Sequence, residues 1–240
     1  IRIYEMNIKD YIILVIFSLG LGWFLVESKP TYKHTPTNDA LALGEAAIKA
    51  HIEAQIDTPT TFSVANQTAL FIGDSHTSNR TQGWQTQLSK AVGFKMINPS
   101  VGGKTTYWML EMAHLKLNNK IDYCFVYGGA NDMYSSHITP QEAVDNIKGI
   151  ARMCTGLGVK CVVLTGFDPV KCTRTSNVKY AGKYSKFQEL LLSEYMDGAQ
   201  VIDTRVVART DCWDGLCHMA PSGHKKIAEK VMKDLAFQRI

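Results

Sequence analysis

The sequence lacks several patterns that would assign a function directly. Its 240 residues contain no Cys-x2-Cys pair, so the six cysteines do not have the spacing of a common zinc site. The segment 102–105, Gly-Gly-Lys-Thr, has no glycine upstream at the spacing of a phosphate-binding P-loop. A net charge of +4, from 26 basic and 22 acidic residues, is too small to indicate a nucleic-acid partner. We therefore expect no metal, no cofactor and no bound nucleic acid.

Charge is missing altogether from one apolar run near the start of the chain. Residues 11–26 would rise roughly 24 Å as a helix, at about 1.5 Å per residue. The flanking Lys9 and Lys29 can snorkel toward the membrane surfaces. No small-x-small cleavage site follows, which favours an anchor that contacts the bilayer over a cleaved signal peptide. We expect residues 1–28 to form an N-terminal transmembrane anchor of a single-pass membrane protein.

A polar segment, residues 29–66, separates the expected anchor from the rest of the chain. It begins with prolines at positions 30 and 36 and reads as a linker. Asn38 can cap one helix within it, at about residues 39–55. This helix is a candidate stalk, a brace on the following domain, or a surface for self-association.

From residue 67 onward, short apolar runs alternate with helical patterns. This alternation predicts a three-layer α/β/α sandwich with a mainly parallel five-stranded sheet over residues 67–240. We expect strands near 69–72, 95–98, 122–127, 161–165 and 200–202. Helices are expected near 82–92, 105–117, 140–155, 180–197 and 221–238. Thr139 is the candidate cap of the helix near 140–155, and Ser222 is the candidate cap of the helix near 221–238.

The most informative stretch is residues 69–78, Ala-Leu-Phe-Ile-Gly-Asp-Ser-His-Thr-Ser. Its apolar run ends abruptly at a Gly-Asp-Ser tripeptide, which predicts a buried strand that delivers Ser75 to the rim of the sheet. Ligands of open α/β folds bind at this rim. The next residue, His76, is expected to be a polar residue at the start of a helix.

Three further polar blocks follow in order. Asn98-Pro-Ser-Val-Gly-Gly-Lys-Thr-Thr106 comes after the second apolar run, and Gly129-Ala-Asn-Asp132 after the third. Asp214-Gly-Leu-Cys-His218 lies just before the last helical segment. A serine, a loop glycine, an asparagine and a late histidine occur in this order in the SGNH hydrolases, also called GDSL esterases. The chain resembles that family over about residues 67–240, and the resemblance implies a flavodoxin-like fold.

The resemblance also implies a role for each residue. Ser75 would be the nucleophile, and His218 the general base that activates it. The backbone N–H groups of Ser75 and Gly103, with the side chain of Asn131, would bind the oxyanion. His224 competes with His218 for the role of base, but it lies where the family often has a bulky residue without a chemical role.

The orienting acid departs from the family pattern. An acid normally stands three residues before the histidine, where this chain has Gly215. One extra residue, Cys217, would place the acid at Asp214, four residues before the histidine. Asp211, seven residues before, is the alternative.

The function implied is a membrane-anchored serine esterase that hydrolyses or transfers an acyl group. An O-acetyl or other carboxylic ester of a cell-envelope glycan or lipid would be its substrate. The contrasting hypothesis is a non-catalytic, membrane-tethered assembly component that retains the fold.

The cysteines indicate on which side of the membrane the catalytic domain lies. Cys124 is expected to be a buried thiol, and the other five cysteines fall near element ends or in loops, where disulfides are feasible. A Cys212–Cys217 bridge would place the catalytic domain in an oxidising compartment, on the periplasmic or extracellular side.

Overall fold

The computed structural model describes residues 61–240 apart from 80, 136, 169–177, 208 and 213–217. The chain divides into two compact units, Ile1–Thr58 and Pro59–Ile240, and the described residues all belong to the second. The expected anchor, residues 1–28, and the helix at 39–55 lie outside the described residues. Among the residues that are described, no helix is both long and apolar enough to cross a membrane.

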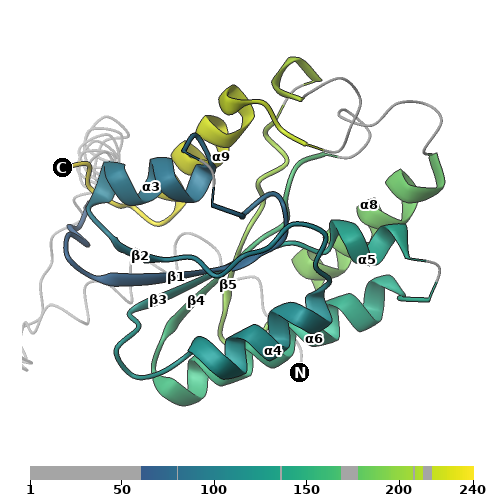
Figure 1. The fold of residues 1–240 in the computed structure, drawn as a ribbon, viewed down its shortest axis with the longest axis horizontal. Coiled ribbons are helices and arrows are strands. Elements are labelled where there is room, and N and C mark those ends of the chain that lie inside the picture. The colour runs from purple at the N-terminus through teal and green to yellow at the C-terminus, as the bar shows by residue number, and fades with distance from the viewer. Residues whose placement is uncertain (1–60, 80, 136, 169–177, 208, 213–217) are drawn as a thin grey trace, which may run out of the picture. The chain divides into compact units, whose positions relative to one another are not determined.

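Five parallel strands form the centre of the second unit (Figure 1). They are β1 (Thr68–Gly73), β2 (Lys95–Ile97), β3 (Tyr123–Tyr127), β4 (Lys160–Leu164) and β5 (Gln200–Ile202). Their spatial order is β2-β1-β3-β4-β5, and each neighbouring pair is parallel. The predicted parallel sheet is therefore confirmed, and the carboxyl ends of all five strands meet at one edge.

Helices cover both faces of this sheet. On one face lie α3 (Trp84–Val92) and α9 (Pro221–Asp234), which pack against each other (Figure 1). On the other lie α4 (Thr106–Lys116) and α6 (Pro140–Leu157), with α8 (Val178–Ser193) packed beside α6. Two short elements, α5 (Ala130–Tyr134) and the 3₁₀ turn η2 (Arg209–Asp211), were not predicted.

One predicted helix cap is confirmed and the other is wrong. Thr139 accepts a hydrogen bond from the Glu142 N–H, and the Glu142 carboxylate accepts from the Thr139 N–H, so that the two residues form a capping box. Ser222 does not cap α9. That helix begins one residue earlier, with Pro221 at its first position, where proline needs no hydrogen-bond acceptor.

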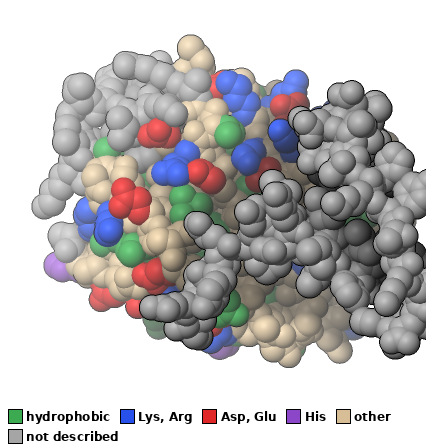
Figure 2. Space-filling view, turned by 180° about the vertical axis from the view of Figure 1, so that it is seen from behind, with side chains coloured by type: hydrophobic (Ala, Val, Ile, Leu, Met, Phe, Trp, Pro, Cys, Tyr) green, Lys and Arg blue, Asp and Glu red, His purple; other side chains and the backbone are tan. Residues whose placement is uncertain are grey.

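Acidic and basic side chains are interspersed on the face shown in Figure 2. Among the ion pairs of the second unit, Lys148 with Glu194 and Arg152 with Asp197 join α6 to the residues that follow α8. This mixture of signs agrees with the small net charge of the chain.

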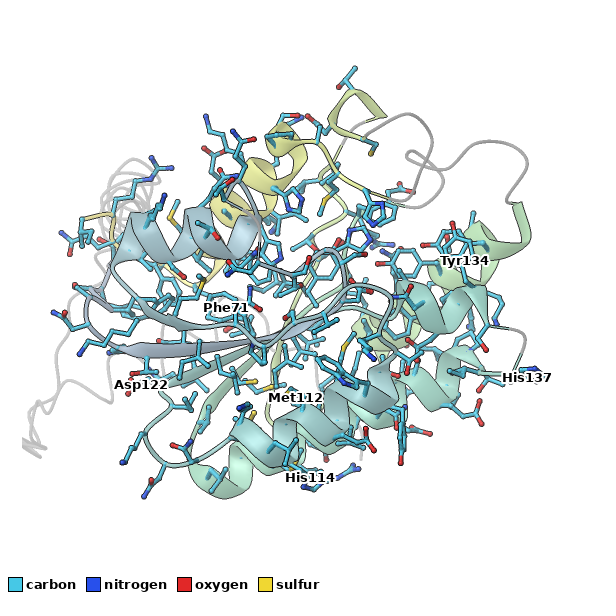
Figure 3. All side chains as sticks on the ribbon, in the orientation of Figure 1. Phe71, Met112, His114, Asp122, Tyr134 and His137 are labelled. Atoms are coloured by element: carbon cyan, nitrogen blue, oxygen red, sulfur yellow. The ribbon has the colours of Figure 1, made fainter. Side chains whose placement is uncertain are left out.

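The core beneath α3 is built from aromatic rings. Phe71 of β1, at the middle of the sheet in Figure 3, lies 5.0 Å from Phe125 of β3 and 5.4 Å from Trp84 of α3, measured between ring centroids. All three side chains are fully buried. Burying an aromatic side chain contributes roughly 1.5–3 kcal/mol, so this cluster ties helix and sheet together strongly.

Three thiols are buried elsewhere in the same core. Cys124 is free, as predicted, but so are Cys154 and Cys161, which we expected near element ends where disulfides are feasible. Both do lie near element ends, three residues before the end of α6 and one residue after the start of β4, but both are buried free thiols. Cys161 is the register partner of Cys124, and Cys154 lies on the buried side of α6.

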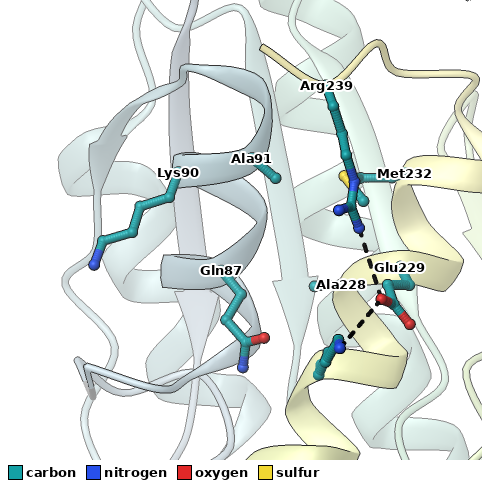
Figure 4. A pocket seen from close by; sticks show the side chains of 8 residues that line it. Gln87, Lys90, Ala91, Ala228, Glu229, Met232 and Arg239 are labelled. Carbon is teal, nitrogen blue, oxygen red and sulfur yellow. Dashed lines mark ion pairs between the residues drawn. The ribbon is translucent and has the colours of Figure 1, made fainter.

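A hollow of about 330 Å³ lies between α3 and α9 (Figure 4). Its rim carries Glu229, which pairs with Lys225 at 4.0 Å and with Arg239 at 3.6 Å. Such exposed pairs contribute only about 0–1 kcal/mol. Because this hollow lies between two helices and away from the loops that carry the four polar blocks, it is not part of the candidate site.

Candidate active site

The first and last polar blocks meet at the carboxyl edge of the sheet. Ser75 lies two residues beyond the end of β1, and its Oγ is 2.9 Å from Nε2 of His218, which is 143 residues away in sequence. His218 lies in the segment that precedes α9. A hydroxyl at this distance can transfer its proton to an imidazole acting as base.

The backbone around Ser75 forms a tight turn. The N–H groups of Thr77 and Ser78 both donate to the Asp74 carbonyl, at 3.1 and 2.8 Å. Glycine is required at position 73, because a Cβ there would stand 2.1 Å from the carbonyl oxygen of Tyr127. The close approach of β1 and β3 at this point positions the serine at the rim.

The second block lies against the first. Asn98 Nδ2 donates to the Thr77 carbonyl at 2.8 Å, and Ser100 Oγ donates to the Phe71 carbonyl at 3.0 Å. A Cβ built on Gly102 would lie 3.5 Å from the Ser75 Cβ, in ordinary contact. Gly103 has a φ of +78°, in the left-handed region that favours glycine. The glycine loop therefore runs directly beside the serine.

The third block adds an amide to the same place. Asn131 stands in the first turn of α5, which begins after Gly129 at a φ of +100°. Its Nδ2 donates to the Lys104 carbonyl at 2.9 Å and, over 3.3 Å, to Asp74 Oδ2. Asn131 thus joins the glycine loop to the residue that precedes Ser75.

Asp132, the next residue, has a structural position. Its carboxylate accepts hydrogen bonds from the N–H and the hydroxyl of Thr106, the first residue of α4. Asn146 of α6 donates to the same hydroxyl at 3.0 Å. These hydrogen bonds tie the start of α4 to α5.

Two buried carboxyl groups give the site an unusual electrostatic character. Complete burial raises the pKa of Asp74 from 3.8 to about 7; the hydrogen bond from the His76 N–H opposes this shift, and the nearby Asp132 charge adds to it. Burial also raises the pKa of Asp132, against the hydrogen bonds from Thr106. Sequence reasoning missed Asp74 because its burial depends on the loops that cover it.

His76 is not the polar helix-start residue we expected. Its side chain is only 2% exposed and lies among aromatic rings, with centroids 5.5 Å from Tyr127, 5.1 Å from Phe167 and 5.3 Å from His218. The imidazole of His76 therefore packs, at a tilt of 30°, against the imidazole that contacts Ser75. Its only signal in the sequence was its position beside the serine.

The competing histidine and acid occupy other environments. His224 is buried in α9, and its Nδ1 accepts a hydrogen bond from the Trp84 N–H at 3.3 Å, which links α9 to α3. The Asp211 carboxylate forms a 2.6 Å ion pair with Lys226. Asp214, the expected acid, and Cys217 lie outside the described residues. The choice between Asp214 and Asp211 stays a prediction.

The described residues that flank positions 213–217 are held by three kinds of contact. Cys212 is disulfide-bonded, and it forms an antiparallel bridge with Met219, the residue that follows His218. The Ala220 N–H donates to the Asp211 carbonyl at 2.7 Å. The other half of the expected Cys212–Cys217 disulfide lies outside the described residues.

Three large side chains in the first turn of α4, Tyr107, Trp108 and Met109, divide between core and surface. Met109 is fully buried, whereas Tyr107 is exposed. Trp108 is partly buried, and the Lys104 ammonium lies 5.7 Å from its ring centroid. Among the described residues, no group of three or more His, Cys, Asp or Glu side chains is arranged to hold a metal ion.

A serine hydroxyl in contact with an imidazole, at the rim of a parallel sheet, is the arrangement of a hydrolase with a serine nucleophile. Residues 71–226 match the GDSL-like lipase/acylhydrolase family. The chain therefore belongs to this family, as its sequence resemblance implied, and is a carboxylic ester hydrolase. No curated protein matches this chain.

Solved structures of esterases share the fold. Axe2, an acetylxylan esterase from Geobacillus stearothermophilus, is 15% identical with a TM-score of 0.56, over 74% of this chain and 98% of its own. The acetyl xylan esterase AlAXEase is 16% identical with a TM-score of 0.59, over 70% and 99%. TesA is 20% identical with a TM-score of 0.54, also over 70% and 99%. Axe2 variants that replace one serine or one histidine with alanine are described as catalytic mutants.

Proposed function

We propose that this protein is a membrane-anchored serine esterase that removes acyl groups, O-acetyl groups foremost, from a cell-envelope glycan. The observation that carries the catalytic part is the 2.9 Å contact between Ser75 Oγ and His218 Nε2, beside the Gly102–Gly103 loop and Asn131. Fold does not determine substrate, so the glycan rests on separate arguments.

In the proposed mechanism, Ser75 Oγ attacks the ester carbonyl while His218 Nε2 takes its proton. His218 then gives this proton to the departing alcohol, and the acyl group stays on the serine. Water activated by the same imidazole hydrolyses the acyl-enzyme. A sugar hydroxyl in place of water would make the same site an acyltransferase.

The oxyanion of the tetrahedral intermediate would be bound by the N–H groups of Ser75 and Gly103 and by Asn131 Nδ2. Asn131 already donates to Lys104 and Asp74, and the bond to Asp74 is the longer one at 3.3 Å. We propose that this longer bond is exchanged for one to the oxyanion. The amide would then be held by the Lys104 carbonyl while it stabilises charge that develops only during the reaction.

Asp214 is proposed as the acid that orients His218. Asp211, the alternative candidate for this acid, already forms a 2.6 Å ion pair with Lys226, and its 3₁₀ turn contacts α9. Catalytic rates of Asp214→Ala and Asp211→Ala, measured per folded molecule, test this choice. A larger loss for Asp211→Ala would reverse the assignment.

Two considerations favour an acetylated glycan. Two of the structurally similar proteins are described as acetylxylan esterases. A membrane anchor at residues 11–26 would hold the enzyme close to an envelope polymer, although it would also suit a lipid ester. The disulfide at Cys212 supports an oxidising compartment, and so the periplasmic or extracellular side of the membrane.

The catalytic part is tested by hydrolysis of p-nitrophenyl acetate by the full chain, beside Ser75→Ala and His218→Ala. We expect both variants to lose nearly all activity. His114→Ala is the matched control, because His114 is an exposed histidine on α4 (Figure 3). Activity that survives in Ser75→Ala would contradict the serine mechanism.

Anchoring is tested in cells, by washing membranes with alkaline carbonate and by digesting intact cells or spheroplasts with protease. The proposal predicts that the protein stays with the membrane and that its catalytic unit is reached from outside. Release by carbonate would contradict the anchor. Protection of the catalytic unit would contradict the proposed side.

A further inference from the structure

An aromatic platform lies at the rim of the candidate site, on α5. Tyr134 is 48% exposed, and its ring stacks on Tyr180 of α8 with centroids 3.9 Å apart and an angle of 13° between the planes. Tyr180 is buried, so the pair has one inner and one outer ring. Figure 3 shows Tyr134 on the side of the molecule where the strands end.

The position of this ring follows from that of the oxyanion donor. Tyr134 comes three residues after Asn131 in the same helix, and side chains three apart on a helix are neighbours, about 5–6 Å between Cβ atoms. Asn131 in turn contacts Asp74, the residue before Ser75. A group bound over the Tyr134 ring therefore lies close to an ester placed at Ser75.

Further contacts hold Tyr134 and Tyr180 in place. Tyr180 stacks on Tyr184, whose ring contacts Phe167, and Phe167 contacts His76 behind His218. The Lys183 ammonium of α8 also donates to the carbonyls of Ser135 and Ile138, at 2.7 and 2.9 Å, which fastens the end of α5. A ring held in this way loses little conformational entropy when a ligand covers it.

We propose that Tyr134, backed by Tyr180, binds a sugar ring of the substrate next to the acylated hydroxyl. This inference rests on the proposed function and assigns its substrate class to glycans. A pyranose has a C–H face that fits a flat aromatic ring and hydroxyl groups around its edge. The described neighbours that follow Tyr134, including Ser135, His137 and Thr139, are mostly polar and suit hydroxyl groups better than an acyl chain.

Two substrates separate this role from catalysis. Acetate release from an O-acetylated xylo-oligosaccharide is compared with hydrolysis of p-nitrophenyl acetate, which carries no sugar. Tyr134→Ala should lower the ratio of the two kcat/KM values about three- to tenfold, mainly through KM for the oligosaccharide, as expected from the loss of one aromatic stack. Tyr134→Phe should keep most of the ratio.

Tyr195→Ala is the matched control, because Tyr195 is 78% exposed and lies beyond the other end of α8. It should leave both reactions unchanged. An equal loss on both substrates in Tyr134→Ala, or no loss on either, would overturn the platform. A third substrate, p-nitrophenyl octanoate, has a longer acyl chain and no sugar. A loss of activity confined to this substrate would also overturn the platform, because the ring would then contact an acyl chain.

Binding separates failure of this inference from failure of the proposed function. Calorimetric titration of Ser75→Ala with the acetylated xylo-oligosaccharide requires no turnover. Weaker binding when Tyr134→Ala is added supports the platform even if the wild-type protein hydrolyses neither substrate. No binding to Ser75→Ala, with p-nitrophenyl acetate hydrolysed by the wild type, would overturn the platform and leave the esterase intact.

Discussion

Two short contacts made by single residues organise the catalytic edge: Ser75 to His218, and Asn131 to the Lys104 carbonyl. Both join segments that are far apart in the chain.

Asn131→Ala should lower kcat for p-nitrophenyl acetate about 100-fold, the usual cost of removing one oxyanion donor. KM should change little, because the charge on the oxyanion develops only in the transition state. Thermal melting followed by circular dichroism controls for folding. If kcat of the folded variant equals that of the wild type, Asn131 is not an oxyanion donor.

His76→Ala should lower kcat about tenfold with little change in KM, because the ring that backs His218 is lost and the imidazole is held less precisely. His76→Phe restores a flat ring of similar size and should recover most of the rate. Steady-state kinetics of both variants give the comparison. A phenylalanine variant as slow as the alanine variant would show that the imidazole of His76 has a chemical role of its own.

Asp74 should make folding depend on pH. Its pKa is raised in the folded state to about 7, so between about pH 4 and 7 the folded protein binds more protons at this group than the unfolded chain does. The stability that it contributes is therefore present at low pH and is lost as pH rises through about 7. Asp74→Asn has no such titration.

Urea unfolding of the wild type and Asp74→Asn at pH 4 to 8 tests this dependence. The variant should gain stability relative to the wild type as pH rises through that range, and the titration of all other groups cancels in the difference. In Asp74→Asn, the new side-chain amide also places an N–H donor opposite the Asn131 amide. This lowers the stability of the variant by an amount that does not vary with pH. A difference that is constant across the range would show that the pKa of Asp74 is not raised.

At the scale of elements, the sequence predicted what local chemistry determines. The three central strands β1, β3 and β4 were visible as apolar runs because nearly all of their residues, on both faces of the sheet, are buried. The edge strands β2 and β5 are shorter and more exposed. Helix α5 was missed because five residues are too few to show a helical period, and its start depends on Gly129. The aromatic contacts of His76 and the burial of Asp74 were missed because they arise only when loops from four strands converge.

Thr139→Ala should destabilise the protein by about 1 kcal/mol, because the capping box at the start of α6 loses its side-chain acceptor. For a domain of this size, that corresponds to a melting temperature lower by about 2–4 °C. Ser222→Ala is the control: Ser222 is exposed at the start of α9 and does not cap it. Equal losses in the two variants would mean that the capping box contributes nothing specific.

At the scale of the whole molecule, the four cysteines within the described residues separate into two groups. Cys124, Cys154 and Cys161 are free thiols inside the core, where an oxidant has little access. Cys212 is disulfide-bonded and lies in the segment that carries His218. A reductant in solution should therefore break the disulfide near His218 before it affects the sheet. The activity of the protein should then depend on whether its compartment is oxidising or reducing.

Reduction of the purified full chain with dithiothreitol should lower kcat for p-nitrophenyl acetate about tenfold, while the circular dichroism spectrum stays native. The reason is that His218 then depends on the Cys212–Met219 bridge and on its neighbours alone to stay near Ser75. Cys212→Ser should already be slow and should not respond to the reductant. Cys124→Ala should keep the response, since that thiol takes no part in the bond. Full activity after reduction verified by thiol counting would show that catalysis does not depend on the disulfide.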